Sequence, residues 1–444
     1  MTIRRRSSAS TEKARTDSGK SDAGKSAAVM GLGYVGLPLL VELARAGLRA
    51  YGFDLDEARV RTINAGKSPI EDVDSATLRK LVKSGRLSAH TESKVLAKAD
   101  AISICVPTPL RKSKEPDISI IQDAVKSLRP HLRRGHLIIL ESTTYPGTTR
   151  EIVRSALEET GLRAGKDFHL AFSPERVDPR NRQWPLTRIP KVIGGVTPQC
   201  TARAAEFYRR IFETVHEVSS ADAAEMAKLL ENTFRAVNIG LVNEFALACH
   251  RLGLDTWEII DAAATKPFGF MPFRPGPGLG GHCIPVDPQY LSWRMRLLNF
   301  STRFIEVADE INSTMPEHVV ERLAVLLNER GLAISRAKIL IVGVAYKPDV
   351  SDTRESPALD ILSLLEERKA RIAYHDTQVA RIDIAGKPHR SLELTPARLK
   401  AFDVAVIVTA HSDLNVKQLC RHAKRVFDCR GVTRGLRGKG IHRL

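Results

Sequence analysis

The feature that most constrains the fold is a glycine pattern that follows a short apolar run near the start of the chain. Residues 27–30 are Ala-Ala-Val-Met, and Gly31, Gly33 and Gly36 then open a helix-like run with the pattern GxGxxG. A second apolar run ends at Asp54, about 20 residues further on. Such glycines let a pyrophosphate approach a helix N-terminus, and the acid accepts from a ribose hydroxyl. The pattern predicts a Rossmann-type domain that prefers NAD to NADP, because a carboxylate disfavours a 2′-phosphate; a glycine turn without a ligand is the alternative.

Further apolar runs continue the alternation of strand and helix, and each ends in a polar turn. The runs are residues 101–106, 137–140 and 170–172, and they are followed by Thr108, Thr143 and Glu175. Ligands of open α/β sheets bind at the carboxyl ends of the strands, so we expect these three side chains to line one crevice. Ordinary roles in turns and helix caps are the alternative.

From about residue 221 the pattern changes to one long helix with apolar residues at three- and four-residue spacing. Lys228 and Asn232 lie one turn apart on a neighbouring face of this helix. They form either a solvated polar face or a pair that points into a cleft. A helix of this length between two sheet units also suits a dimer interface.

Residues 276–288 form a loop rich in glycine and proline around Cys283. Glycine permits close approach to the backbone and proline stiffens it. A thiolate is a strong nucleophile where its surroundings lower its pKa, so Cys283 is a candidate catalytic residue; a buried, inert thiol is the alternative. A zinc site made of His282, Cys283 and Asp287, or a Cys–His hydrolase pair, is disfavoured because adjacent residues in an extended loop point apart.

A second series of strand and helix patterns begins near residue 337 and predicts a second Rossmann-like domain. Its first turn carries Lys347 and Arg354, which are either solvated or hold a diphosphate and the cofactor between the domains. The predicted fold class is α/β, with two Rossmann-like doubly wound domains joined by a long central helix and a helical dimerisation region. The expected divisions are a disordered basic tail (1–25), an NAD-binding domain (26–215), a central helical domain with the cysteine loop (216–330) and the second Rossmann-like domain (331–444).

Composition limits the class of protein further. The six scattered cysteines contain no CxxC pair, which favours a reduced, cytoplasmic protein. No apolar run approaches the roughly 18 residues of a membrane span, and no secretory signal follows Met1, so we expect no membrane partner. The net charge of +17 suits a nucleotide ligand, but no nucleic-acid-binding motif is present. Residues 19–26 match the phosphate-loop pattern GxxxxGK[ST] by chance, since no strand pattern precedes them.

Together these residues resemble the nucleotide-sugar dehydrogenase family, also called the UDP-glucose/GDP-mannose dehydrogenase family. The resemblance covers nearly everything from Ala27 to the C-terminus and rests on the ordered motifs GLGYVG, VPTP, ESTTYPGTT, SPER, KLLENTFRAVNIGLVNE, GPGLGGHCIPVDP and GVAYKPDVSDTRESPA. It implies a homodimer built on the long helix, NAD as cofactor, and a UDP-sugar bound by the C-terminal domain. It also implies oxidation of the sugar C6 alcohol to a carboxylate, with two NAD consumed, through a thiohemiacetal and a thioester on Cys283.

The resemblance implies roles for individual residues. Glu175 corresponds to the general base, Lys228 to a lysine that stabilises the developing oxyanion, and Thr143 to a residue near the nicotinamide. The implied catalytic set is Cys283, Lys228, Glu175, Asn232, Asp287 and Thr143. The implied cofactor-binding set is Gly31, Gly33, Val35, Gly36, Asp54, Thr108, Thr143 and Arg354. The implied substrate-binding set is Glu175, Lys228, Asn232, Phe273, Arg274, Gly276, Lys347 and, from the neighbouring subunit, Lys266.

Two departures bear on the substrate. Val286 replaces a lysine that follows the nucleophile in UDP-glucose enzymes, and Pro179, beside Asp178, replaces a second glutamate. The motifs favour the branch that acts on UDP-N-acetylhexosamines, with UDP-N-acetyl-D-glucosamine as the expected substrate, for surface polysaccharide precursors. UDP-N-acetyl-D-mannosamine and UDP-glucose are alternatives with the same chemistry. A catalytically inactive nucleotide-sugar-binding module is the alternative of another class.

Overall fold

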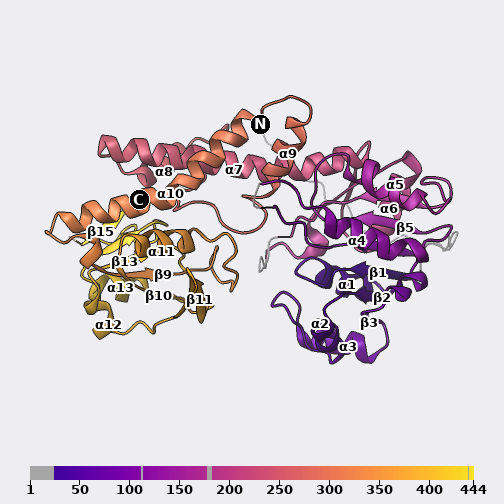
Figure 1. The fold of residues 1–444 in the computed structure, drawn as a ribbon, viewed down its shortest axis with the longest axis horizontal. Helices are drawn as coiled ribbons and strands as arrows, with labels where there is room; N and C mark the ends of the chain where they lie inside the picture. The colour runs from indigo at the N-terminus through magenta and orange to yellow at the C-terminus, as the bar shows by residue number, and fades with distance from the viewer. Residues whose placement is uncertain (1–24, 112–113, 178–182, 439) are drawn as a thin grey trace, which may run out of the picture.

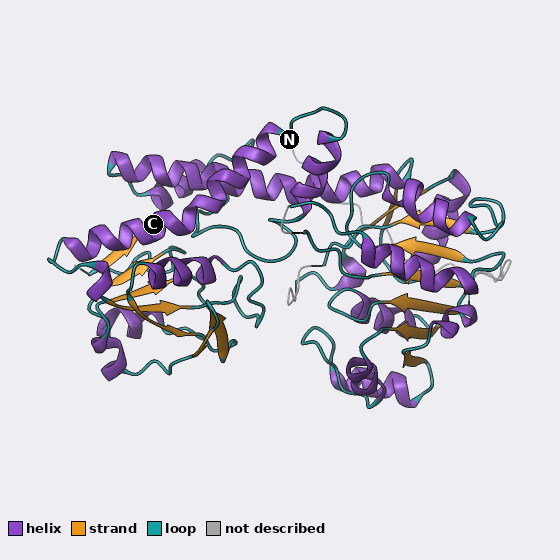
Figure 2. Cartoon of the chain, viewed as in Figure 1, coloured by secondary structure: helices purple, strands orange, loops and turns teal. Residues whose placement is uncertain are grey.

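The computed structural model describes residues 25–111, 114–177, 183–438 and 440–444. The chain forms two α/β units that are joined by long helices lying across both (Figure 1). Figure 2 shows that each unit is built on a sheet with helices packed against it. The expected basic tail lies outside the described residues except for Lys25, and so do Asp178 and Pro179.

The first sheet has eight strands in the order β3-β2-β1-β4-β5-β6-β7-β8. Strands β1 to β6 pair in parallel, whereas β7 runs antiparallel to β6. The order reverses at β1, which lies between β2 and β4, and ligands bind at such a switch point. The strands are Ser26–Met30 (β1), Arg49–Phe53 (β2), Leu87–His90 (β3), Ala101–Ile104 (β4), Leu137–Leu140 (β5), His169–Phe172 (β6), Lys191–Gly195 (β7) and Val215–Glu217 (β8).

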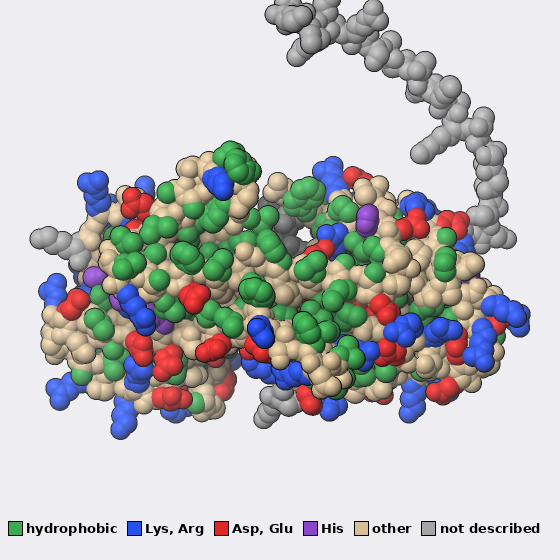
Figure 3. Space-filling model, turned by 90° about the horizontal axis from the view of Figure 1, so that it is seen from above, with side chains coloured by type: hydrophobic (Ala, Val, Ile, Leu, Met, Phe, Trp, Pro, Cys, Tyr) green, Lys and Arg blue, Asp and Glu red, His purple; other side chains and the backbone are tan. Residues whose placement is uncertain are grey.

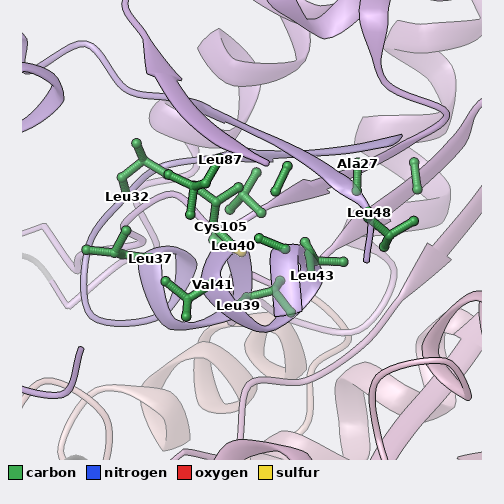
Figure 4. Packing of buried hydrophobic residues seen from close by; sticks show 14 of the residues in the cluster. Ala27, Leu32, Leu37, Leu39, Leu40, Val41, Leu43, Leu48, Leu87 and Cys105 are labelled. Carbon is green, nitrogen blue, oxygen red and sulfur yellow. The ribbon is translucent and has the colours of Figure 1, made fainter. Parts of the chain in front are cut away.

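Helices cover this sheet and bury its apolar strands. Leu37, Leu40 and Leu43 of α1 are fully buried in a cluster with residues of β1 and β2 (Figure 4), and each such side chain stabilises the fold by roughly 1.5–3 kcal/mol. The helices are Gly36–Arg45 (α1), Glu57–Asn64 (α2), Ser75–Lys83 (α3), Ser119–Leu128 (α4), Arg154–Glu158 (α5) and Pro198–Tyr208 (α6). Short helical turns are Ser93–Lys98 (η1), Arg129–His131 (η2), Thr148–Val153 (η3, a π-helix) and Leu186–Arg188 (η4).

The central region is helical, as predicted from residue 221 onward. Its helices are Ala221–Leu252 (α7), Thr256–Ala263 (α8), Asp287–Arg296 (α9) and Arg303–Asn328 (α10). The Ser220 side chain caps the start of α7 by accepting from the backbone N–H of Ala223, and Gly253, with φ of 69°, ends the helix. Helices α7 and α10 are joined by a buried hydrogen bond of 2.8 Å from Asn243 to Asn312.

One side of α7 carries exposed apolar side chains, which we call the α7 apolar face. Its members are Met226, Leu230, Phe234, Leu241 and Phe245. They recur at intervals that keep them within one narrow arc of the helix. The exposed fractions range from 41% at Met226 to 66% at Leu230. Hydrophobic side chains gather on the upper surface of the molecule, where the long helices lie (Figure 3). A monomer of ordinary composition rarely exposes such a continuous patch.

The second sheet has five parallel strands in the order β10-β9-β13-β14-β15. They are Lys338–Val342 (β9), Arg371–His375 (β10), Val404–Ile407 (β13), Val426–Asp428 (β14) and Ile441–Arg443 (β15), with a separate hairpin of Arg381–Ile384 (β11) and Lys387–Arg390 (β12). The flanking helices are Ile334–Arg336 (η5), Pro357–Glu367 (α11), Pro396–Ala401 (α12) and Val416–His422 (α13). The predicted α/β class with two Rossmann-like units and a long connecting helix is confirmed.

The phosphate-loop look-alike ends at Ser26, which is the first residue of β1. A phosphate-binding loop would continue into a helix at this point, so the described end of the motif agrees with a chance match. Within the described ranges, no helix combines the length and the apolar character that crossing a membrane requires.

Candidate active site

The glycine turn after β1 has the shape that a dinucleotide-binding fingerprint requires. A Cβ atom on Gly31, which has φ of +88°, would lie 2.6 Å from the carbonyl oxygen of Cys105. A Cβ atom on Gly36 would lie 1.8 Å from the carbonyl oxygen of Gly31, so only glycine lets α1 pack this closely. At Gly33 a Cβ would meet nothing within 4 Å, which leaves room for a pyrophosphate at the start of α1, after Val35. The turn fits NAD.

Asp54 lies at the end of β2, beside this turn, and is 8% exposed. Its carboxylate accepts from the backbone N–H of Leu32 at 2.7 Å and of Asp56 at 2.9 Å. The guanidinium of Arg59, in α2, donates to both carboxylate oxygens at 3.1 and 2.9 Å. Arg59 was not identified from the sequence. Its place in the first turn of the helix that follows Asp54 could have indicated this contact.

The carboxyl ends of β4, β5 and β6 lie at one edge of the sheet, because Ile104 pairs with Leu140 and Leu140 with Phe172. Thr108, Thr143 and Glu175 follow these strand ends, and all three are partly exposed. The carbonyl oxygen of Thr108 accepts from the Tyr290 hydroxyl of α9 at 2.7 Å. The edge of the sheet therefore faces the central helices.

Behind Glu175 lies a buried polar network that sequence reasoning missed. The ammonium of Lys191, in β7, donates to Glu141 at 2.5 Å and reaches the carbonyl oxygen of Pro174 at 3.5 Å. The Tyr208 hydroxyl donates to the same carboxylate. Burial raises the pKa of the Glu175 carboxyl, and the nearby Lys191 ammonium opposes this rise. A carboxyl whose pKa is raised in this way is suited to accept and release a proton during a reaction.

Helix α7 brings its polar face to this edge and to the cysteine loop. Lys228 is 7% exposed and its ammonium donates to the carbonyl oxygen of Glu175 at 2.6 Å. One turn later, the Asn232 amide donates to the carboxylate of Asp287, the first residue of α9. The backbone N–H of Asp287 in turn donates to the carbonyl oxygen of Cys283 at 2.8 Å. Lys228 and Asn232 therefore contact neighbouring elements, whereas a solvated polar face would leave both side chains in water.

Cys283 is partly exposed and lies among charged side chains from several elements. Burial raises the pKa of its thiol to about 11; Asp287 and Glu175 add to the rise, whereas Lys228 and Arg354 oppose it. The resting thiol is therefore protonated at neutral pH. Burial also raises the pKa of the Asp287 carboxyl to about 6, against the charge of Lys228 and the hydrogen bond from Asn232.

The segment before the cysteine packs against α7, α8 and the second unit. The Phe273 ring meets Phe234 edge-on at 5.8 Å. Arg274 forms an ion pair of 2.5 Å with Asp261. The backbone N–H of Gly276 donates to Asn243 at 2.9 Å, and a Cβ atom at Gly276 would lie 2.7 Å from the Arg430 guanidinium. Lys266 is exposed, and its ammonium lies 5.0 Å from the centre of the Phe268 ring.

The second unit reaches the site through the turn after β9, which carries Lys347 and Arg354. The carbonyl oxygen of Arg354 accepts from the backbone N–H of Gly281 at 3.1 Å, and its guanidinium pairs with Asp352 at 2.6 Å. Tyr34, in the glycine turn of the first unit, lies near both charges: burial raises its pKa, Asp352 adds to the rise and Arg354 opposes it. Lys347 is partly exposed on the same turn. The two units therefore approach each other at the cysteine loop.

No cluster of His, Cys, Asp or Glu side chains in the described parts of the chain has the arrangement of a metal site. All six cysteines are free thiols. The chemistry that this arrangement offers is that of a thiol, an ammonium and carboxylates beside a dinucleotide turn.

The two Rossmann-like units and the dinucleotide turn define an NAD-dependent oxidoreductase with a second nucleotide-binding unit. Comparison with known proteins makes this specific: the chain belongs to the UDP-glucose/GDP-mannose dehydrogenase family. Models of the family's NAD binding domain, central domain and UDP binding domain match residues 25–212, 222–314 and 340–435. The predicted family and cofactor are confirmed, and the protein is an NAD-dependent UDP-sugar dehydrogenase.

Individual relatives differ in their sugar. A UDP-N-acetyl-D-glucosamine 6-dehydrogenase of Pseudomonas aeruginosa is 34% identical over 408 residues, which covers 90% of this chain and 95% of that protein. A UDP-N-acetyl-D-mannosamine dehydrogenase of Methanococcus maripaludis is 34% identical over 417 residues and covers 91% and 92%. The solved structure of a UDP-D-ManNAc dehydrogenase from Pyrococcus horikoshii has a TM-score of 0.86 at 32% identity and covers 94% of this chain and 98% of that one.

Proposed function

We propose that this protein oxidises the C6 alcohol of UDP-N-acetyl-D-glucosamine to the carboxylate in two successive oxidations, and that the product is a precursor of surface polysaccharide. The observation that carries the proposal is the set of charges around Cys283. Lys228, Glu175 and Asp287 all act on the pKa of its thiol, so a nucleophile, an ammonium and two carboxylates share one site. Four-electron oxidation through a thioester needs these groups together.

The three regions of the chain divide the work in this proposal. Residues 26–215 hold NAD through Gly31, Gly33, Val35, Gly36, Asp54, Thr108 and Thr143, with Arg354 reaching across from the second unit. Bound NAD supplies the hydride acceptor for each oxidation. Residues 216–330 supply the thiol and the long helix, and residues 331–444 hold the UDP group. Phe273, Arg274, Gly276 and Lys347 enclose the sugar nucleotide.

Covalent catalysis begins once C6 is an aldehyde. The Cys283 sulfur attacks this carbon and forms a C–S bond, the thiol proton passes to Glu175, and the carbonyl electron pair moves to the oxygen beside Lys228. The ammonium stabilises the oxyanion, which is the usual source of most of the rate enhancement in such steps. The thiohemiacetal that results can be oxidised to a thioester, because the alkoxide electron pair can re-form the C=O bond while the hydrogen on the same carbon leaves as hydride to the acceptor that bound NAD would supply.

Hydrolysis of the thioester completes the reaction. Glu175 first releases the thiol proton to solvent; water then adds to the acyl carbon and passes its proton to Glu175. The C–S bond breaks, and the departing thiolate of Cys283 takes up this proton from Glu175. Asn232, Asp287 and Thr143 orient the water and the sugar in this proposal. Asp287, whose pKa is about 6, is ionised at neutral pH and can accept a hydrogen bond from the water.

The α7 apolar face supports a homodimer as the working form. Leu230 and Phe245 expose 66% and 54% of their surface in the single chain. A second copy of the same helix would cover them, and it would bring Lys266 of a neighbouring subunit toward the substrate. Sedimentation velocity tests this: the wild type is expected to sediment as a dimer or larger oligomer, and a Leu230→Asp, Phe245→Asp double variant as a monomer. A monomeric wild type would contradict the proposal.

We further propose that the enzyme works in the cytoplasm, since six free thiols, one of them a nucleophile, suit a reducing compartment. A substrate panel tests the proposed sugar. Initial rates with UDP-N-acetyl-D-glucosamine should exceed those with UDP-N-acetyl-D-mannosamine and UDP-glucose in kcat/KM. A preference for the mannosamine sugar, which the Methanococcus and Pyrococcus relatives are named for, would change the proposed substrate but not the proposed reaction. No activity with any of the three sugars, together with binding of NAD and a UDP-sugar, would favour an inactive binding module.

A further inference from the structure

A buried carboxylate, outside the residues that act on the substrate, holds a loop of the active site. Glu225 of α7 is fully buried, with 0% of its surface exposed. Its Oε2 accepts from the backbone N–H of Gly147 at 2.7 Å. Its Oε1 accepts from the backbone N–H of Thr149 at 2.9 Å and from the Thr149 hydroxyl at 2.6 Å. Three donors of one short segment therefore converge on a single side chain.

The segment that Glu225 holds has unusual local structure. Gly147 has φ of +101°, and the π-helix η3 begins directly after it. Wide turns of this kind leave N–H groups without partners inside the helix, and π-helices occur frequently at functional sites. An ionised carboxylate fits three donors because it only accepts hydrogen bonds and has about four positions for them. A neutral side chain in the same place would leave at least one buried donor unpaired.

The location links three parts of the active site. Glu225 lies three residues before Lys228 on α7, so both side chains lie on the same side of the helix. The segment it holds begins four residues after Thr143. The same segment is tied to α9, because Arg294 donates to both oxygens of Glu151 at 2.8 and 2.9 Å. Helix α9 begins at Asp287, so one segment is fixed against both helices that carry the proposed catalytic side chains.

We propose that Glu225 is a positioning residue, which in its ionised form keeps the loop that carries Thr143 in register with Lys228. The inference rests on the proposed function of these two residues and adds a protonation requirement to it. When Glu225 takes up a proton, one of its oxygens becomes a hydrogen-bond donor, although it faces a donor of Gly147 or Thr149. At least one of the three hydrogen bonds is then lost, and the loop is no longer held in place.

The surroundings place this protonation near neutral pH. Burial raises the pKa of Glu225 to about 7; the hydrogen bonds from Thr149 and Gly147 oppose the rise and Asp222, one turn earlier on α7, adds to it. The other charged groups of the packed elements are paired: Arg150 with Asp222 at 3.1 Å, and Glu151 with Arg294. The Tyr145 hydroxyl also faces this region, and the charge of Glu225 contributes to the rise of its pKa, which burial dominates.

The test is the pH dependence of kcat in the full-length enzyme with saturating substrate and NAD. With an ionisation near pH 7, wild-type kcat should fall roughly tenfold between about pH 8 and about pH 6. Glu225→Gln should lower kcat about tenfold or more at pH 8. It should also remove this acidic limb of the kcat profile, leaving only the weaker fall caused by groups of lower pKa such as Asp287. Asp222→Asn is the matched control, since it removes a carboxylate from the same helix and leaves all three hydrogen bonds; its kcat at pH 8 should stay within about twofold of wild type.

A second variant keeps the test decisive if Glu225→Gln fails to fold. Thr149→Val removes one hydroxyl donor and preserves the shape of the side chain. Since that hydrogen bond holds the pKa of Glu225 down, the acidic limb of kcat should move up by about 0.5 to 1 pH unit. An unmoved limb in Thr149→Val, or an unchanged profile in Glu225→Gln, would overturn the inference. A wild type that fails to oxidise any UDP-sugar would instead overturn the proposed function.

Discussion

The resting thiol of Cys283 should be a poor nucleophile before substrate binds, by a margin that follows from its pKa. At about pH 8, a thiol with a pKa of about 11 contains roughly 100-fold less thiolate than one with a pKa near 9. The thiolate of higher pKa is more nucleophilic, by roughly tenfold for a Brønsted slope of about 0.5. The net rate of thiol–disulfide exchange should therefore be about tenfold below that of an unperturbed thiol.

The assay is the release of the coloured thiol from an aromatic disulfide reagent as the pH is raised. The rate constant of Cys283 should increase about tenfold per pH unit and show no plateau up to about pH 10, whereas an ordinary thiol levels off near pH 9. Cys283→Ser measures the background, to which Cys420 contributes because it is the other partly exposed cysteine. A plateau at or below pH 9 would refute the reasoning, since the thiol would then be activated in the resting protein.

Three further predictions concern the cofactor turn, the ammonium and the buried acid. Gly33→Ala should keep the melting temperature and raise the KM for NAD, whereas Gly36→Ala, whose Cβ would lie 1.8 Å from a carbonyl oxygen, should lower the melting temperature; equal effects on both quantities would contradict the fingerprint geometry. Lys228→Met should lower kcat by roughly 100- to 1,000-fold and leave the Kd for NAD unchanged in titration calorimetry, and a kcat near wild type would remove the oxyanion role. The pKa of Asp287 is raised by folding, so its contribution to stability is present at low pH and is lost as pH rises through about 6. Asp287→Asn should therefore gain on the order of 1 kcal/mol in unfolding free energy, relative to wild type, between about pH 5 and about pH 8; a difference independent of pH in denaturant titrations would show that burial does not raise the pKa of this carboxyl.

The parts of the site that could be predicted from the sequence depend on local patterns. The dinucleotide-binding turn could be predicted because its glycines, Gly31, Gly33 and Gly36, lie between a strand pattern and a helix pattern in one continuous stretch of chain. The spacing of apolar residues in α7 predicted a helix that the structure extends from Ala221 to Leu252. Polar residues after buried strands could be assigned to one sheet edge because parallel strands share the direction of their carboxyl ends.

The parts that could not be predicted depend on contacts between distant segments. Glu225 and Gly147 are 78 residues apart, and the sequence around either residue gives no indication that the two are in contact. Asn232 and Asp287 are 55 residues apart, and only the family resemblance brought them together. The strand β7 was missed because it ends in Gly194 and Gly195, which are unusual in strands, and because it pairs antiparallel with β6 in a sheet that is parallel up to this point.

The thioester route through Cys283 is tested most directly by the number of NADH molecules released per molecule of limiting UDP-N-acetyl-D-glucosamine, measured in the wild type and in Cys283→Ala. The wild type should release two NADH per sugar, with the uronic acid as the product. Cys283→Ala should form no net acid but should still bind NAD and UDP-sugar. One NADH per sugar in the wild type, or wild-type formation of the acid in Cys283→Ala, would contradict the thioester route.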